Sequence, residues 1–177
     1  MTTFFNRLSA GKVRFLGLSA LSLILVAASA AIVIRNADFK GEWAFNEQKS
    51  KLAEGRGRMA AQKMKVSQDG DALVIDRTSN TPNGETVSYT DKLTFDGKTS
   101  ESTVFGNSKK KSTAAWSSNG EEMTINSTIN FERDGNTFEV KITEVWKLLD
   151  GGKTLSIDYT SVSQRGTNNQ TLVYDKK

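Results

Sequence analysis

The sequence of 177 residues contains no cysteine and no histidine. Without cysteine the chain cannot form disulfides, use a thiol in catalysis or carry a lipid on an N-terminal cysteine. Without histidine it lacks the most frequent general base and the most frequent metal ligand. These absences exclude much of enzyme chemistry, and the sequence predicts no catalytic motif, no cofactor and no metal site.

The chain also has no net charge beyond residue 37. The chain has 24 Lys and Arg against 20 Asp and Glu. Residues 1–37 hold four basic residues and no acidic ones, so they account for the whole excess: Arg7, Lys12, Arg14 and Arg35. A neutral remainder does not attract a phosphate backbone, and no nucleic-acid partner is predicted.

The first 37 residues have the pattern of an export segment. Basic residues precede an uninterrupted apolar or small run of 20 residues, from Phe15 to Ile34. In one interpretation, residues 1–37 contain a signal peptide that is cleaved after Ala30. The run is also long enough to span a bilayer as an uncleaved helix, with residues 38–177 outside. Both alternatives predict an exported domain, periplasmic or extracellular, with membrane contact only through this segment.

Beyond the leader, strand-like runs alternate with Asp-Gly or Asn-Gly pairs, at Asp69-Gly70, Asp96-Gly97, Asn119-Gly120, Asp134-Gly135 and Asp150-Gly151. Such pairs favour tight turns between antiparallel strands because they tolerate positive φ. We take the first four as the centres of two-residue turns and the last as part of a four-residue loop from Asp150 to Lys153. These assignments predict which residues face each other.

The predicted registers bring apolar residues together on one face of the sheet. The pairs are Val66 with Leu73, Met64 with Ile75, Trp116 with Met123, Phe131 with Phe138, Trp146 with Ile157, Leu148 with Leu155, and, around Asp96-Gly97, Leu93 with Ser100. The other face carries Thr, Asn, Lys and Glu, which is typical of a sheet with one solvated side.

About eight to ten such strands run from near Gly41 to near Tyr174. The sequence therefore predicts an all-β fold, an up-and-down antiparallel meander that closes into a barrel; a two-sheet sandwich is the alternative. The run Lys109-Lys110-Lys111 lies between strand-like segments and is interpreted as a solvated loop or a guarded strand edge. The long connection from Asn46 to Gln62 contains a possible helical turn at Glu47 to Glu54.

Charged and small residues interrupt the apolar face. Small side chains such as Ser102 and Ser127 leave volume unfilled and suggest a cavity. Asp91 and Glu144 share that face, where a lone buried carboxylate needs a partner or a proton. The register places Ser102 opposite Asp91 and Tyr159 opposite Glu144, and Arg77 is the expected counter-charge.

These residues define a predicted ligand-binding site, with a structural alternative. The site consists of Asp91, Glu144, Tyr159, Tyr89, Arg77, Ser102 and Ser127. In the alternative, Asp91 and Arg77 lie at a rim in contact with water, and Glu144 is held by a structural hydrogen bond to Tyr159. Charged residues are rarely fully buried, which favours the alternative for Arg77.

The first predicted strand, Gly41-Glu42-Trp43 with Phe45, followed by Asn46 to Ser50, resembles the Gly-x-Trp opening of lipocalin-like, or calycin-like, β-barrels. The resemblance is to small secreted bacterial members of unassigned function. It implies that Trp43 closes the floor of a barrel whose cup binds small, often apolar ligands. The chain departs from the family pattern in having about ten strands rather than eight and no clear helix after the last strands.

Three functions are compatible with this pattern. The first is an exported, non-enzymatic barrel that binds a small apolar or amphipathic ligand. The second is an envelope protein that uses its outer face for structure or for binding other proteins, without a ligand. The third is a hydrolase that uses Asp91 and Glu144 as an acid/base pair.

Overall fold

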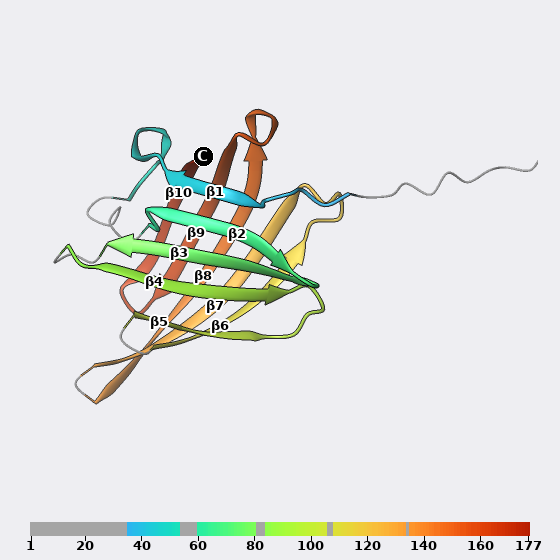
Figure 1. The fold of residues 1–177 in the computed structure, drawn as a ribbon. Coiled ribbons are helices and arrows are strands. Elements are labelled where there is room, and N and C mark those ends of the chain that lie inside the picture. Colours follow the sequence, from blue (N-terminus) through green and yellow to red (C-terminus); the bar gives the residue numbers. More distant parts are fainter. Residues whose placement is uncertain (1–34, 54–59, 81–83, 106–107, 134) are drawn as a thin grey trace, which may run out of the picture. The chain divides into compact units, whose positions relative to one another are not determined.

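The computed structural model describes residues 35–53, 60–80, 84–105, 108–133 and 135–177 (Figure 1). The predicted export segment falls almost entirely on residues 1–34, outside the described residues. Within the described part of the chain, no helix has the length and apolar character needed to cross a membrane.

Ten strands account for most of the described residues. They are β1 (Gly41–Phe45), β2 (Lys63–Asp69), β3 (Ala72–Asn80), β4 (Thr86–Thr94), β5 (Ser100–Val104), β6 (Ser108–Trp116), β7 (Glu122–Arg133), β8 (Asn136–Leu149), β9 (Thr154–Ser163) and β10 (Gly166–Lys176). Short 3-10 helices occupy Glu47–Lys49 (η1) and Asp150–Gly152 (η4). η1 is shorter than the helical turn predicted from Glu47 to Glu54, because the chain is extended again at Ser50, and Glu54 lies outside the described residues. Asn46 Oδ1 caps the start of η1 by accepting from Lys49 N at 3.1 Å.

The strands form one antiparallel sheet in the order β4-β3-β2-β1-β10-β9-β8-β7-β6-β5. Strands that follow each other in the sequence also pair in the sheet, except β4 and β5. In addition, β1 pairs with β10, which joins the two halves of the chain. The sheet curls into a nearly closed barrel (Figure 1). The predicted up-and-down meander is confirmed, and the strands do not divide into the two sheets of a sandwich.

Most predicted registers are confirmed. Trp116 pairs with Met123, Phe131 with Phe138, Trp146 with Ile157 and Leu148 with Leu155. The β2–β3 register was predicted wrongly: Val66 pairs with Ile75, because the turn is centred on Gly70-Asp71 rather than Asp69-Gly70. The error is two residues, and a shift of two leaves each side chain on its predicted face.

The hairpin predicted around Asp96-Gly97 does not form a ladder. β4 and β5, both fully described, are the two ends of the strand order. Leu93 and Ser100 therefore do not pair, although the two strands remain adjacent. We call the junction between β4 and β5 the seam. Side chains cross it: the Tyr89 and Phe105 ring centroids are 5.5 Å apart, and Ser102 Oγ donates to Asp91 Oδ1 at 2.9 Å.

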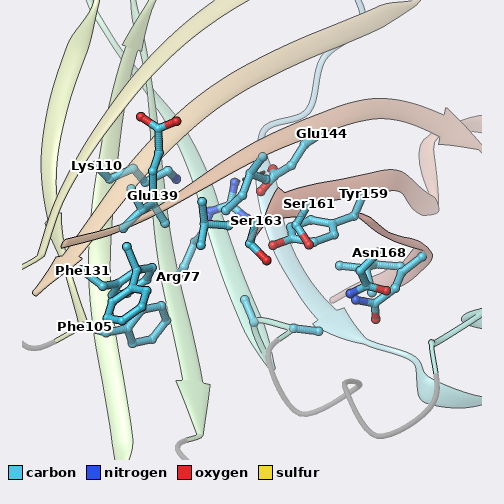
Figure 2. A pocket seen from close by; sticks show the side chains of 18 of the residues that line it. Arg77, Phe105, Lys110, Phe131, Glu139, Glu144, Tyr159, Ser161, Ser163 and Asn168 are labelled. Atoms are coloured by element: carbon cyan, nitrogen blue, oxygen red, sulfur yellow. Dashed lines mark hydrogen bonds and ion pairs between the residues drawn. The ribbon is translucent and has the colours of Figure 1, made fainter. Parts of the chain in front are cut away.

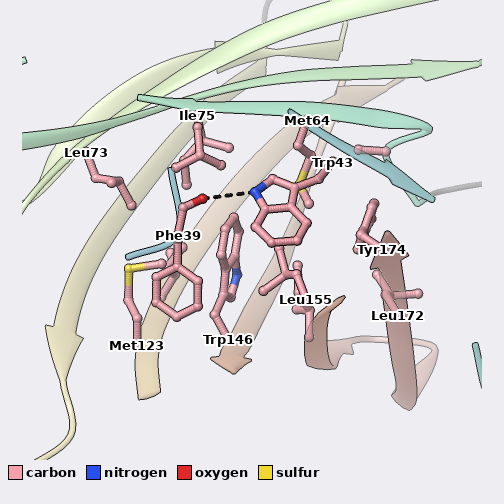
Figure 3. Packing of buried hydrophobic residues seen from close by; sticks show 14 of the residues in the cluster. Phe39, Trp43, Met64, Leu73, Ile75, Met123, Trp146, Leu155, Leu172 and Tyr174 are labelled. Atoms are coloured by element: carbon pink, nitrogen blue, oxygen red, sulfur yellow. Dashed lines mark hydrogen bonds between the residues drawn. The ribbon is translucent and has the colours of Figure 1, made fainter. Parts of the chain in front are cut away.

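Aromatic side chains close one end of the barrel, which we call the floor (Figure 3). Phe39 stacks on Trp116 with ring centroids 5.6 Å apart and meets Trp146 edge-on at 5.7 Å. Trp43 Nε1 donates to the Phe39 carbonyl oxygen at 2.9 Å, which ties the segment before β1 to the core. Trp43 and Trp146 are almost completely buried. Trp43 thus lies in the floor, as the Gly-x-Trp resemblance implied.

Candidate functional site

A cavity of about 750 Å³ occupies the half of the barrel opposite the floor (Figure 2). Residues near the β5–β6, β7–β8 and β9–β10 turns surround its mouth, including Phe105, Phe138 and Gln164. Ala60 and Ala61, just before β2, also line it. This volume lies within the range of sites that hold a small organic molecule, on the order of 300–1,000 Å³.

Four charged side chains meet at the inner end of the cavity, and we call them the ion cluster: Arg77, Asp91, Lys110 and Glu144. All are at most 6% exposed. Arg77 Nη2 lies 2.7 Å from Glu144 Oε2, and Lys110 Nζ lies 2.7 Å from Asp91 Oδ2. Arg77 Nε lies 3.2 Å from Asp91 Oδ2, which links the two pairs. Two cations and two anions therefore balance within the barrel, as buried charges require.

The strand alternation explains why these charges point inward. Arg77 on β3 is directly opposite Tyr89 on β4, and Asp91 follows Tyr89 by two residues on the same face. Glu144 on β8 is opposite Tyr159 on β9. Residues two apart on a strand share a face, so four separate strands deliver their charges to one height of the barrel.

Neutral side chains complete the hydrogen bonding of the ion cluster. Glu144 Oε2 accepts from Trp146 Nε1 at 2.8 Å, and Asp91 Oδ1 accepts from Ser102 Oγ. Arg77 Nε is buried and, among the described residues, has no acceptor with hydrogen-bond alignment, so its contact with Asp91 is an ion pair only. The Arg77 guanidinium also lies 5.5 Å from the centroid of the Trp146 ring, at the border of the floor.

The pKa directions follow from burial and pairing. Burial alone would raise the pKa of Asp91, but Lys110 and Arg77 outweigh it and lower that pKa below its ordinary value. Burial likewise opposes the charge of Glu144, and Arg77 and Lys110 lower its pKa. Burial raises the pKa of Tyr159 to about 12. At neutral pH the carboxylates are therefore ionised and the Tyr159 hydroxyl keeps its proton.

The structure places four predicted site residues, Arg77, Tyr89, Glu144 and Tyr159, on the cavity wall. Asp91 and Ser102 are not among the described residues that line the cavity. Asp91 pairs with both Arg77 and Lys110, and Ser102 donates to Asp91 across the seam. Ser127 does not line it either. Its Oγ lies 2.8 Å from Ser112 Oγ, its partner across the β6–β7 ladder, so the two hydroxyls satisfy each other.

The alternative interpretation, in which Asp91 and Arg77 lie at a wet rim and Glu144 bonds to Tyr159, was wrong in these details. Arg77 and Asp91 are 5% and 2% exposed and do not lie at a water-filled rim. Glu144 accepts hydrogen bonds from Arg77 and Trp146. A residue opposite in the ladder is close, but these stronger or better-placed donors supply the bonds to the carboxylate.

Lys110 is the site residue that the sequence interpretation missed. The run Lys109-Lys110-Lys111 is not a loop but part of β6, and Lys110 is 3% exposed. Lys110 is an even number of residues from Trp116 on the same strand, and Trp116 was predicted to face inward. That parity was the available signal, and the two neighbouring solvated lysines obscured it.

The cluster does not supply an acid/base pair for hydrolysis. A general acid must carry a proton at working pH, whereas both carboxyl groups have lowered pKa values and are paired with cations. Among the described residues, no group of three or more His, Cys, Asp or Glu side chains is arranged to hold a metal ion. The described cavity instead offers an apolar surface with a few convergent polar groups.

Comparison with known proteins adds a likeness in fold. No protein-family model matches the chain, and no curated protein matches its sequence. A solved structure of zebrafish ileal bile acid-binding protein, complexed with cholic acid, is similar with a TM-score of 0.46 and 19% sequence identity. The similarity covers 78% of this chain and 98% of that chain. Similarity at this level does not define a family or a ligand for this chain.

Proposed function

We propose that this protein binds one small amphipathic molecule inside its barrel and acts as a carrier or sensor. The observation that carries the proposal is the cavity of about 750 Å³, whose inner end holds an ion cluster and whose outer half has aromatic and aliphatic side chains on the side of β7 and β8. A barrel that served only as a scaffold would gain stability by filling this space, because unfilled interior volume forgoes packing.

The architecture separates stability from binding. The floor residues Phe39, Trp43 and Trp146 pack tightly at one end of the barrel. The mouth residues Phe105, Phe131 and Phe138 lie at the other end, and Phe138 is 38% exposed. Exposed aromatic side chains at a cavity mouth are costly in water and are covered when an apolar molecule binds.

A fluorescence titration with Nile red, an uncharged apolar dye, tests the proposal on the protein purified from cells that express the full chain. We expect saturable binding of one dye per chain. Val140 lines the cavity, and Val140→Trp should weaken binding at least about tenfold by filling the site. Lys141→Trp is the matched control, because Lys141 is exposed on the outer face of the same strand. Absence of saturable binding, or equal binding by the two variants, would contradict the proposal.

We also propose that the domain functions outside the cytoplasm. The support is the basic and apolar pattern of residues 1–37 together with the start of barrel contacts at the end of this segment, where Ala37 N donates to Gly120 O and Phe39 stacks on Trp116. Cell fractionation and the intact mass of the purified protein test this. A mass that begins at Ala31 indicates cleavage, and the full mass in the membrane fraction indicates an anchor. Recovery of the protein in the cytoplasm would contradict export.

A further inference from the structure

The inner face of β9 and β10 changes character half-way along the barrel. Near the floor it carries Leu155 and Ile157 on β9, opposite Tyr174 and Leu172 on β10. Toward the mouth the same face becomes polar. There Tyr159 pairs with Gln170, and Ser161 pairs with Asn168. We call these four residues the polar wall, and all of them line the cavity.

On the opposite side of the cavity, at the same height, the inward-facing residues of β7 and β8 are apolar, and the alternating Glu132 and Glu139 are exposed. On β7 and β8, Ile129 pairs with Val140 and Phe131 with Phe138, and Phe105 lies nearby. We call these five residues the apolar wall. Figure 2 shows Phe105 and Phe131 on one side of the cavity, and Tyr159, Ser161 and Asn168 on the other. The cavity thus has two chemically different sides rather than an apolar body with a single polar end.

The polar wall has hydrogen-bonding capacity to spare. Among the described residues, no hydrogen bond is made by the side-chain amides of Asn168 and Gln170, although both are only partly exposed and face the cavity. Their neighbour Asn169, on the outer face, does accept a hydrogen bond, from Thr160 Oγ1 at 2.9 Å. Each free amide offers two N–H donors and one carbonyl acceptor, a set suited to hydroxyl groups.

The ion cluster gives no preference for a charged ligand. Arg77 and Lys110 are each already within 2.7 Å of a carboxylate oxygen. A ligand carboxylate placed beside them would be a third anion against two cations in a buried site, and a ligand ammonium would be a third cation against two anions. Either unbalanced charge is costly where water is excluded.

Resting on the function proposed above, we infer that the ligand carries an uncharged, hydroxyl-rich group, as glycosides do, on an apolar body. The hydroxyl groups lie along the polar wall and bond to the amides of Asn168 and Gln170. The apolar body contacts Phe131 and Phe138 across the cavity. Neither wall alone would select this chemistry, but together they favour molecules with both parts.

Competition against Nile red tests the inference with probes of equal chain length, each used below its micellar concentration. Decyl β-glucoside is uncharged and hydroxyl-rich, decanoate is anionic and decyltrimethylammonium is cationic. We expect the glucoside to displace the dye at a concentration at least about tenfold lower than either charged probe. Free glucose should not displace it, because the sugar lacks the apolar body. Equal or tighter binding of a charged probe would overturn the inference.

Two neighbouring asparagines provide a matched pair of variants. Asn168→Leu should weaken decyl glucoside binding about three- to tenfold, the effect of losing one or two neutral hydrogen bonds. The same variant should not weaken Nile red binding. Asn169→Leu, on the outer face, should leave both affinities unchanged. Equal glucoside binding by the two variants would overturn the inference while the proposed function stands, whereas failure of the wild type to bind Nile red would remove the proposed function itself.

Discussion

Asp91 joins more strands than its single side chain suggests. It sits on β4 and accepts contacts from Arg77 on β3, Ser102 on β5 and Lys110 on β6. Two of these contacts cross the seam, where the ladder is interrupted. The carboxylate therefore has two roles: it neutralises the cations at the inner end of the cavity, and it connects the two edges of the sheet.

Removing one member of the Asp91–Lys110 pair should be costly, because a buried charge loses its partner. We expect Asp91→Asn to lower the free energy of unfolding by about 3 kcal/mol and Lys110→Met by a similar amount. The double variant should lose much less than the sum, since it leaves neither charge unpaired. Urea denaturation of the four proteins measures this cycle.

An exposed ion pair of similar length serves as the control for this cycle. Lys92 Nζ lies 2.6 Å from Asp69 Oδ2, with both side chains at least 60% exposed. Asp69→Asn and Lys92→Met should leave the urea midpoint essentially unchanged, because solvent screens such pairs. Additive losses in the Asp91–Lys110 double variant would show that the buried pair is not energetically coupled.

The sequence could predict which charges face inward but not which of them meet. Alternation placed Arg77, Asp91 and Glu144 on the inner face, and that placement is confirmed. Lys110 follows the same alternation, yet its lysine neighbours made the segment look solvated. The ion pairs themselves depend on how far the sheet curls, and local pattern contains no information on that curvature.

The seam between β4 and β5 distinguishes these strands from the rest of the barrel. All other consecutive strands are joined by ladders, whereas β4 and β5 each have a ladder on one side only. The Asp96-Gly97 pair correctly predicted a reversal of the chain, but a turn signal does not require that the flanking strands pair. Side-chain contacts, including the 5.5 Å ring contact of Tyr89 with Phe105, substitute for main-chain bonds along this junction.

Amide hydrogen exchange should reveal the seam. About half of the amide protons in β4 and β5 point toward it without a ladder acceptor, and we expect them to exchange at least about tenfold faster than those in β8 and β9. The latter strands have ladder partners on both sides. Resolved exchange rates by NMR measure the contrast. Equal protection of all four strands would mean that main-chain bonds close the seam in solution.

The β2–β3 hairpin shows how far turn signals define an element. Moving the turn from Asp69-Gly70 to Gly70-Asp71 shifts the register by two residues, so Val66 meets Ile75. Gly70 has φ of +58° and supplies the positive backbone angle in either arrangement. Because the burial of the two faces is the same in both registers, periodicity alone could not distinguish them.

The barrel as a whole divides its interior into a packed floor, a charged layer and an open half. The apolar alternation of the sequence predicted the sheet and its closure, and the small residues on the inner face suggested a cavity. The two serines predicted to line that cavity, Ser102 and Ser127, instead hydrogen-bond within the protein. The cavity lies instead where the polar wall faces Phe131 and Phe138, a pairing across the barrel that only the tertiary structure defines.

The charged layer makes the stability of the whole molecule dependent on acid pH. The folded-state pKa values of Asp91 and Glu144 lie below their ordinary values of 3.8 and 4.5, because Lys110 and Arg77 outweigh burial. The unfolded chain therefore takes up protons first as pH falls. The stabilisation is complete above about pH 5 and is lost progressively as pH drops through and below these ordinary values. Urea midpoints at pH 7, 5, 4 and 3 measure the decline.

A double variant, Asp91→Asn with Glu144→Gln, is the control. Its urea midpoint should be lower than that of the wild type at pH 7 and should decline less steeply with falling pH. The exposed carboxylates Asp69 and Asp175 contribute equally to both proteins. Parallel curves for the wild type and the double variant would assign the acid sensitivity to those exposed groups instead.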